Sequence, residues 1–312
     1  MYYPYLRGKQ NELILLRENA QLIAKSNFVP IIEPVKSNLN PLNKCIDVLI
    51  AFESSFILIA NPKCGDLESE YQTIENDLLT DELLKYPNLV IGYICDENTV
   101  LDQLSEFLEK YSHNKVALIH YGFGNGKKLS QTISDFKNIC THVFIEDHAQ
   151  KRYRKNFNSG AARVLVRDGF HKRPNREHPK VEHFSELHIM YTEENMDGFG
   201  DFVISGDEYS ESGGPAYAVA IHLTYLDDDD EDDMFIKHYV SDRNSTPADP
   251  GGKFLEALKK LVVDVDADGK MYQSDAVKEY KALYARSHFP GLGVVKKLSM
   301  QHHIQLLSEF LK

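Results

Sequence analysis

The feature that most constrains this sequence is a repeated alternation between short apolar runs and segments with helical periodicity. Continuous runs rich in Val, Ile and Leu are typical of parallel strands that are buried on both faces of a sheet. We predict eight such strands, at residues 2–7, 29–33, 56–60, 89–94, 115–120, 141–146, 163–167 and 201–205. Helices are predicted between and after them, at residues 11–25, 41–52, 70–85, 100–111, 128–136, 150–156 and 181–194.

Eight strand–helix units in a chain of 312 residues match the size and repeat count of a (β/α)8 TIM-like barrel. The alternative is an open, doubly wound sheet, which often carries a glycine-rich turn after its first strand. Here the first turn reads Arg7-Gly8-Lys9-Gln10, which lacks the G-x-G-x-x-G pattern. We therefore predict an α/β fold in which residues 1–312 form a single (β/α)8 barrel domain.

The last third of the chain departs from this repeat. Residues 216–226 and 234–240 have the pattern of two strands joined by an acidic run, so we predict that residues 208–242 form a β-hairpin inserted after the eighth strand. Helices are predicted at 252–263, 275–287 and 300–311, and we expect residues 250–312 to pack on the barrel. The segment 264–269 resembles the start of a calcium-binding EF-hand loop, with an ordinary acidic turn as the alternative.

Charge and cysteine content limit the class of protein. The net charge of −12 argues against a surface that generally coats nucleic acid. No apolar run approaches the roughly 20 residues of a membrane span, and we expect neither a signal peptide nor a membrane partner. The cysteines, Cys45, Cys64, Cys95 and Cys140, are widely spaced without a C-x-x-C pair. This favours reduced thiols in a cytoplasmic protein over a disulfide framework or a zinc site.

Three segments carry a family resemblance. Residues 2–13 read YYPYLRGKQNEL, residues 30–35 read PIIEPV and residues 289–293 read FPGLG. In these segments the chain resembles the beta protein family, a group of bacterial and phage-borne proteins. The resemblance implies a prokaryotic protein from a mobile-element or antiphage gene cluster. It implies no catalytic residues and no particular chemistry.

The candidate functional residues follow the ends of the predicted strands, because the active sites of (β/α)8 barrels lie at the carboxyl ends of their strands. These positions are densely polar in this sequence. We predict that the catalytic residues are Glu33, His120, Glu146 and Asp168. We predict that the substrate-binding residues are Arg7, Lys36, Asn61, Arg167, Lys172 and Arg173.

Carboxylates and imidazoles at such a mouth can act as general acids and bases, and His120 is the candidate general base because imidazole titrates near neutral pH. Adjacent strand residues point to opposite faces, so only one of Glu146 and Asp147 can face the barrel interior. Glu33, Glu146 and Asp168 are also a candidate oxygen-ligand set for Mg²⁺. No spacing motif enforces that set, so we assign no metal ligand and leave the cofactor unknown. The alternative to a functional ring is a salt-bridge network that seals the barrel.

Residues 148–180 form a basic stretch within this acidic chain, with ten Lys or Arg residues and two acids. Part of it, 171–176, follows the seventh predicted strand, where many barrels bind phosphate. Arginine side chains match the geometry of phosphate oxygens. We therefore predict an anionic ligand, such as a nucleotide or a nucleic acid.

Two functions stay open at this point. The first is a hydrolase in an antiphage or mobile-element conflict system, acting on a phosphate-bearing substrate, either a nucleotide or a nucleic acid. The second is a non-catalytic binding or scaffold component that recognises a nucleic acid or a partner protein encoded nearby. The enzyme hypothesis predicts that the polar residues converge around an open pocket. The binding hypothesis predicts that they pair with one another.

Overall fold

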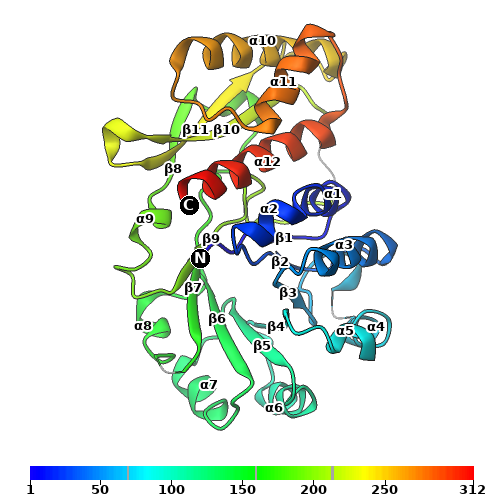
Figure 1. The fold of residues 1–312 in the computed structure, drawn as a ribbon, viewed down its shortest axis with the longest axis vertical. Coiled ribbons are helices and arrows are strands. Elements are labelled where there is room, and N and C mark those ends of the chain that lie inside the picture. Colours follow the sequence, from blue (N-terminus) through cyan, green and yellow to red (C-terminus); the bar gives the residue numbers. More distant parts are fainter. Residues whose placement is uncertain (69, 159, 212–213) are drawn as a thin grey trace. The chain divides into compact units, whose positions relative to one another are not determined.

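The computed structural model describes residues 1–68, 70–158, 160–211 and 214–312. Eight parallel strands form a nearly closed barrel in the order β1-β2-β3-β4-β5-β6-β7-β9 (Figure 1). These strands are β1 (Tyr5–Leu6), β2 (Ile31–Ile32), β3 (Phe56–Ile59), β4 (Leu89–Cys95), β5 (Lys115–His120), β6 (Ile139–Ile145), β7 (Ala162–Val166) and β9 (Gly198–Gly200). Consecutive strands therefore lie side by side, as repeated β–α crossovers require.

The barrel closes where the N-terminal segment meets β9. Tyr2 forms a parallel bridge with Phe199, and the Tyr3 amide donates a hydrogen bond to the Phe199 carbonyl at 2.8 Å. Gly200 permits this approach, because a Cβ atom at that position would lie 2.1 Å from the Tyr3 carbonyl oxygen. The backbone groups at this seam are paired, which limits the exposed sheet edge.

Helices and short turns connect the strands of the barrel. They are α1 (Gln10–Glu18), α2 (Ala20–Lys25), α3 (Asn40–Ala51), η1 (Gly65–Leu67), α4 (Tyr71–Asp77), α5 (Asp81–Leu84), α6 (Leu101–Lys110), α7 (Gly126–Thr132) and α8 (Lys151–Arg154). Local sequence explains several of their starts. Asn125 caps α7 by accepting a hydrogen bond from the Lys128 amide, and Thr80 caps α5 in the same way through Leu83.

One face of each strand fills the barrel interior, because successive side chains on a strand point to opposite faces. On β5, Ala117 and Ile119 belong to the interior cluster. The alternate residues Leu118 and His120 are buried outside that cluster. The cluster also contains Tyr3, Tyr5, Val29, Ile31, Ile57, Ile59, Ile94, Val143, Ile145, Val164, Val166 and Phe202.

The chain divides into two compact units, residues 1–168 with 190–202, and residues 169–189 with 203–312. The second unit contains a three-stranded antiparallel sheet in the order β10-β11-β8. Its strands are β8 (Val181–Ser185), β10 (Ala220–Asp227) and β11 (Asp233–Val240). The short elements nearby are η2 (Asn175–Glu177), α9 (Leu187–Met190) and η3 (Asp228–Asp230).

Three longer helices complete the second unit: α10 (Pro250–Asp268), α11 (Asp275–Ala285) and α12 (Leu292–Phe310). Their apolar faces form one cluster with β10. The side chains of Leu223, Phe254, Leu258 and Tyr280 in this cluster are fully buried. Burial of such side chains is the main source of stability for a unit of this kind. This cluster is separate from the interior cluster of the barrel.

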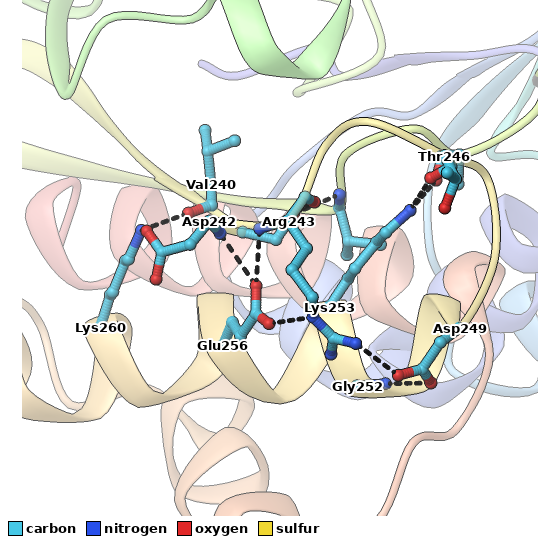
Figure 2. A network of polar contacts seen from close by, with 12 residues as sticks. Val240, Asp242, Arg243, Thr246, Asp249, Gly252, Lys253, Glu256 and Lys260 are labelled. Atoms are coloured by element: carbon cyan, nitrogen blue, oxygen red, sulfur yellow. Dashed lines mark hydrogen bonds and ion pairs between the residues drawn. The ribbon is translucent and has the colours of Figure 1, made fainter.

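A polar network holds the chain between β11 and α10 against that helix (Figure 2). Asp249 caps α10 by accepting a hydrogen bond from the Gly252 amide at 2.9 Å. Glu256 lies one turn after Gly252 and accepts hydrogen bonds from the backbone amides of Asp242 and Arg243. It also pairs with the Arg243 guanidinium. This arrangement fixes the entry of the chain into α10.

The structure confirms the (β/α)8 barrel, the hairpin after the eighth strand and the additional C-terminal helices. The eighth strand lies at 198–200, earlier than predicted, and the predicted helix at 181–194 is wrong, because residues 181–185 form β8 and only 187–190 are helical. The resemblance of residues 264–269 to the start of an EF-hand loop does not correspond to a loop in the structure, since α10 continues to Asp268. Residues 212 and 213 of the hairpin segment lie outside the described residues, and the packing of 250–312 on the barrel stays a prediction.

Among the described residues, no helix has both the length and the apolar character needed to cross a membrane.

Candidate functional site

Glu33 and Arg7, predicted from the ends of the first two strands, lie together. The Glu33 side chain is 0% exposed and accepts hydrogen bonds from the Tyr5 hydroxyl at 2.8 Å, Arg7 Nε at 3.3 Å and the Lys63 amide at 2.9 Å. Cys64 Sγ donates to the same carboxylate at 3.4 Å. Burial and the nearby Glu33 carboxylate raise the pKa of the Cys64 thiol to about 12, so it stays protonated. This carboxylate is thus saturated by protein donors.

Asn61 follows β3 and binds the neighbouring strand. Its side-chain amide donates to the Ile94 carbonyl at 2.9 Å, and its carbonyl oxygen accepts from the Ile94 amide at 2.7 Å. Both hydrogen-bonding groups of the side chain are therefore used to continue the ladder of β4 beyond the end of β3. Lys36, after β2, forms an ion pair with Asp66 at 3.8 Å.

His120 lies on the outer face of the barrel and not at its mouth, because Ala117 and Ile119 take the interior positions of β5. Its Nδ1 is hydrogen bonded to the Tyr153 hydroxyl at 2.8 Å, and its Nε2 to His142 Nδ1 at 3.0 Å. Burial, with a smaller contribution from His142, holds the pKa of His120 well below its ordinary value. The structure therefore does not bring His120 together with Glu33.

Glu146 and Arg167 lie together beyond β6 and β7. Arg167 donates to both carboxylate oxygens of Glu146, with Nη2 3.2 Å from Oε1. Arg154, on α8, is 3.8 Å from the same carboxylate and 3.2 Å from Glu194. Bidentate pairs of this kind are strong and geometrically specific. Asp168, two residues after β7, is partly exposed at the end of the first unit.

The two predicted phosphate-binding side chains after Gly169 belong to the second unit, and each is paired with an acid. Lys172 Nζ is 3.2 Å from Glu208, and Arg173 Nη2 is 2.7 Å from Glu182. Among the described residues, the groups with metal-ligand spacing do not include Glu33, Glu146 or Asp168. The catalytic and substrate-binding roles assigned from the sequence stay predictions.

A cleft of about 690 Å³ opens at the carboxyl ends of β3 and β4, and we call it the rim cleft. Residues 61–63 and 96–100, which follow β3 and β4, line it together with residues of α4 and α6. Its charged lining residues are Lys63, Glu68, Glu75, Asp96, Glu97, Glu106 and Lys110. A concave site of this volume is in the range used for small-molecule ligands, which is ~300–1,000 Å³.

Ion pairs organise part of the rim cleft. Lys63 lies 3.8 Å from Asp96, and Lys110 lies 2.5 Å from Glu75. Burial alone would raise the pKa of Glu75, but hydrogen bonds from Lys110 and Tyr71 outweigh it and lower the pKa. Glu97 and Glu106 are exposed, and within the described part of the chain no hydrogen bond or ion pair is found for either side chain.

The sequence indicated only part of the rim cleft. Asn61, Lys63, Asp96 and Glu97 follow predicted strands, whereas Glu75, Glu106 and Lys110 lie within helices. No sequence signal distinguishes those helical residues from an ordinary solvated face. Their role depends on the packing of two helices around the ends of two strands.

No family model and no curated protein match this chain. Among solved structures, the chain is similar to a putative dihydrodipicolinate synthase family protein from Coccidioides immitis, with 10% identity, a TM-score of 0.40 and coverage of 96% of this chain and 80% of that one. It is also similar to D-psicose 3-epimerase with D-tagatose from Clostridium cellulolyticum H10, with 13% identity, a TM-score of 0.36 and coverage of 64% and 83%. At TM-scores this low, neither similarity carries an argument about what this chain binds.

Proposed function

We propose that the barrel binds a small, positively charged organic ligand, an amine or a quaternary ammonium compound, in the rim cleft. The observation that carries this proposal is the charge of the cleft. Its lining has five carboxylates against two lysines, a net charge of −3. Carboxylates in a concave site attract cations and repel phosphate groups, because the low-dielectric walls focus the field.

Aromatic side chains in the same lining fit that ligand. Tyr93 and Phe107 lie with ring centroids 4.8 Å apart, and Tyr71 and Phe107 with centroids 6.2 Å apart. Ammonium groups bind over aromatic faces through the ring quadrupole, and this is a common mode of quaternary ammonium recognition. Burial raises the pKa of Tyr93 to about 12, so its ring stays uncharged at neutral pH.

The hydrolase predicted from the sequence would need Arg167, Lys172 and Arg173 to be available for phosphate. Each of these side chains is already paired with a glutamate. A phosphate-bearing substrate, a role in phage defence, and a protein or nucleic-acid partner all stay predictions. A small cationic ligand is favoured here because it would contact Glu97 and Glu106, the exposed lining residues described above.

The test is a thermal-shift and calorimetric titration of the full chain with putrescine, spermidine and choline, alongside inorganic phosphate and a nucleotide. We expect at least one of the cations to raise the melting temperature and to bind at the rim cleft. The double variant Glu97→Gln/Glu106→Gln should bind it roughly tenfold more weakly, a change of about 1.4 kcal/mol. Glu109→Gln removes an exposed carboxylate of α6 that is not in the lining and should leave binding unchanged.

Binding of phosphate or the nucleotide without binding of any cation would overturn the proposal. The hydrolase hypothesis would then be the favoured one. Equal binding by the wild type and the Glu97→Gln/Glu106→Gln variant would place the ligand elsewhere and would also contradict it.

A further inference from the structure

Three histidines that are far apart in the sequence meet in the second unit. His222 of β10 and His238 of β11 are direct cross-strand partners. His178 lies three residues before the start of β8, the other neighbour of β11, and the His238 amide donates to the Lys180 carbonyl at 2.9 Å. One ring nitrogen from each of the three histidines lies within 4.8 Å of the other two.

The ring nitrogens of this cluster face one another without a full set of hydrogen-bond partners. Nδ1 of His222 and Nδ1 of His238 are 2.6 Å apart, a contact in which only one of the two nitrogens can donate. Nδ1 of His178 is buried and has no hydrogen-bond partner. Buried polar atoms in native proteins are almost always satisfied, so an orphaned ring nitrogen within this cluster calls for an explanation.

Glu182 supplies the support that metal-binding histidines usually have. Its Oε1 lies 3.0 Å from His238 Nε2 and 3.7 Å from His178 Nδ1. A carboxylate that accepts the far N–H of an imidazole fixes the tautomer and leaves the opposite nitrogen as a lone-pair donor. Here that opposite nitrogen is Nδ1 of His238, which points at His222.

An imidazole binds a metal ion in its neutral form. Burial lowers the pKa of His178 and of His222, and burial together with His178 lowers the pKa of His238 to about 4. Arg173 contributes to the lowered pKa of His178 and His238, where Glu182 opposes it, and Lys296 contributes to the lowered pKa of His222.

We propose that His178, His222 and His238 form a binding site for a divalent transition-metal ion of the zinc class. Three imidazoles favour Zn²⁺ over Mg²⁺ or Ca²⁺, which prefer oxygen ligands. Bonds of ~2.0–2.1 Å in a tetrahedral site place ligand nitrogens roughly 3.4 Å apart, so small side-chain rotations bring this cluster to that geometry. The fourth position is left to water. This site and the rim cleft belong to different units, so the inference does not depend on the proposed function.

The test uses the full chain, stripped of metal with a chelator, dialysed and titrated with Zn²⁺ alone. We expect one tightly bound Zn²⁺ per chain by calorimetry and by elemental analysis after gel filtration. Loss of an outer-shell partner costs about 10- to 100-fold in metal affinity, so Glu182→Gln should weaken binding by that factor. His222→Ala and His238→Ala remove ligands and should weaken it by more than about 100-fold.

Two histidine variants act as matched controls. His288 is exposed between α11 and α12, and His183 is an exposed β8 residue that pairs with Glu186 and Asp233. His288→Ala and His183→Ala should bind Zn²⁺ as the wild type does. Co²⁺ provides a second readout, because a His-ligated four-coordinate Co²⁺ absorbs far more strongly in the visible than the hydrated ion. Melting curves in chelator establish that each variant is folded. If an alanine variant is unfolded, His238→Gln takes its place as the variant that lacks a ligand.

The proposal is overturned if the wild type takes up no stoichiometric Zn²⁺. It is equally overturned if folded ligand variants bind as the wild type does, or if binding is lost with His183→Ala instead.

Discussion

The two units each contain a buried group of histidines, and the groups differ in where their ring nitrogens point. In the barrel unit, His120 uses both nitrogens, one with Tyr153 and one with His142, and its ring stacks on Phe144 at 4.6 Å. In the second unit, His222 and His238 direct Nδ1 atoms at each other, and His178 Nδ1 lacks a partner.

A lowered pKa does not by itself identify a metal site. Burial is the largest cause of the lowered pKa in both groups. What distinguishes them is satisfaction of the nitrogens and the presence of a carboxylate. Both ring nitrogens of His120 have neutral partners within an aromatic cluster. In the second group Glu182 holds His238 Nε2, and the Nδ1 atoms of His222 and His238 face each other.

The largest effect expected within this comparison is on stability. His120→Ala should lower the free energy of unfolding by about 3–5 kcal/mol, because it opens a cavity beside Phe144 and leaves the Tyr153 hydroxyl and His142 without their partner. The measurement is urea denaturation at pH 7 with chelator present. His113→Ala changes an exposed histidine of the same unit and should stay within ~0.5 kcal/mol of the wild type. A His120→Ala midpoint equal to that of His113→Ala would refute a structural role for His120.

The next effect concerns pH. Burial, with the nearby Arg163, lowers the pKa of His142 from 6.5 to about 4. Below pH 6.5 the unfolded chain binds a proton that the folded chain refuses, so the stability due to neutral His142 is complete above pH 6.5 and is lost as the pH falls toward 4. Between pH 7 and 5 this single group should cost about 2 kcal/mol, at 1.36 kcal/mol per pH unit.

The measurement compares denaturation of the wild type and of His142→Gln at both pH values. The variant should lose about 2 kcal/mol less on acidification than the wild type. Equal losses would show that His142 takes up its proton in the folded chain as readily as in the unfolded one.

The smallest expected effect is on the Zn²⁺ affinity of the histidine group in the second unit. Lys296 is exposed and its charge lowers the pKa of His222, so Lys296→Met should raise Zn²⁺ affinity by only a few-fold. The gain should shrink at high ionic strength, because salt screens exposed charges. Lys259→Met, on the exposed face of α10, is the matched control and should leave the affinity unchanged. A salt-independent gain, or the same gain in both variants, would count against an electrostatic effect at His222.

The barrel was predictable because its signal is local. At β3, for example, an uninterrupted apolar run needs burial on both faces, and the predicted run 56–60 nearly coincides with the strand. The prediction for residues 181–185, the strand β8, failed for the opposite reason. In residues 181–188 the apolar residues Val181, Phe184 and Leu187 recur every third position, as they do on a helix, and only pairing with the distant β11 makes residues 181–185 a strand.

The positions of the functional residues were less predictable, because they depend on which face of a strand each side chain takes and on pairing between strands that are distant in the sequence. His120 was placed at the mouth, although alternation from Ile119 sends it to the outer face. The facing pair His222 and His238 does have a sequence signal. Both lie eight residues from Asp230, the centre of the acidic turn, so a symmetric hairpin places them opposite each other. Nothing in the sequence indicates that His178 joins them.

The division of the second unit into residues 169–189 and 203–312 has a consequence for the order of synthesis on the ribosome. β9, which closes the barrel, is made before β11, the sheet partner of β8. A nascent chain that ends shortly after residue 202 therefore has every barrel strand, while β8 waits as an unpaired edge. His178 and Glu182 wait with it, and the histidine cluster becomes complete only when the last strand of the sheet has emerged.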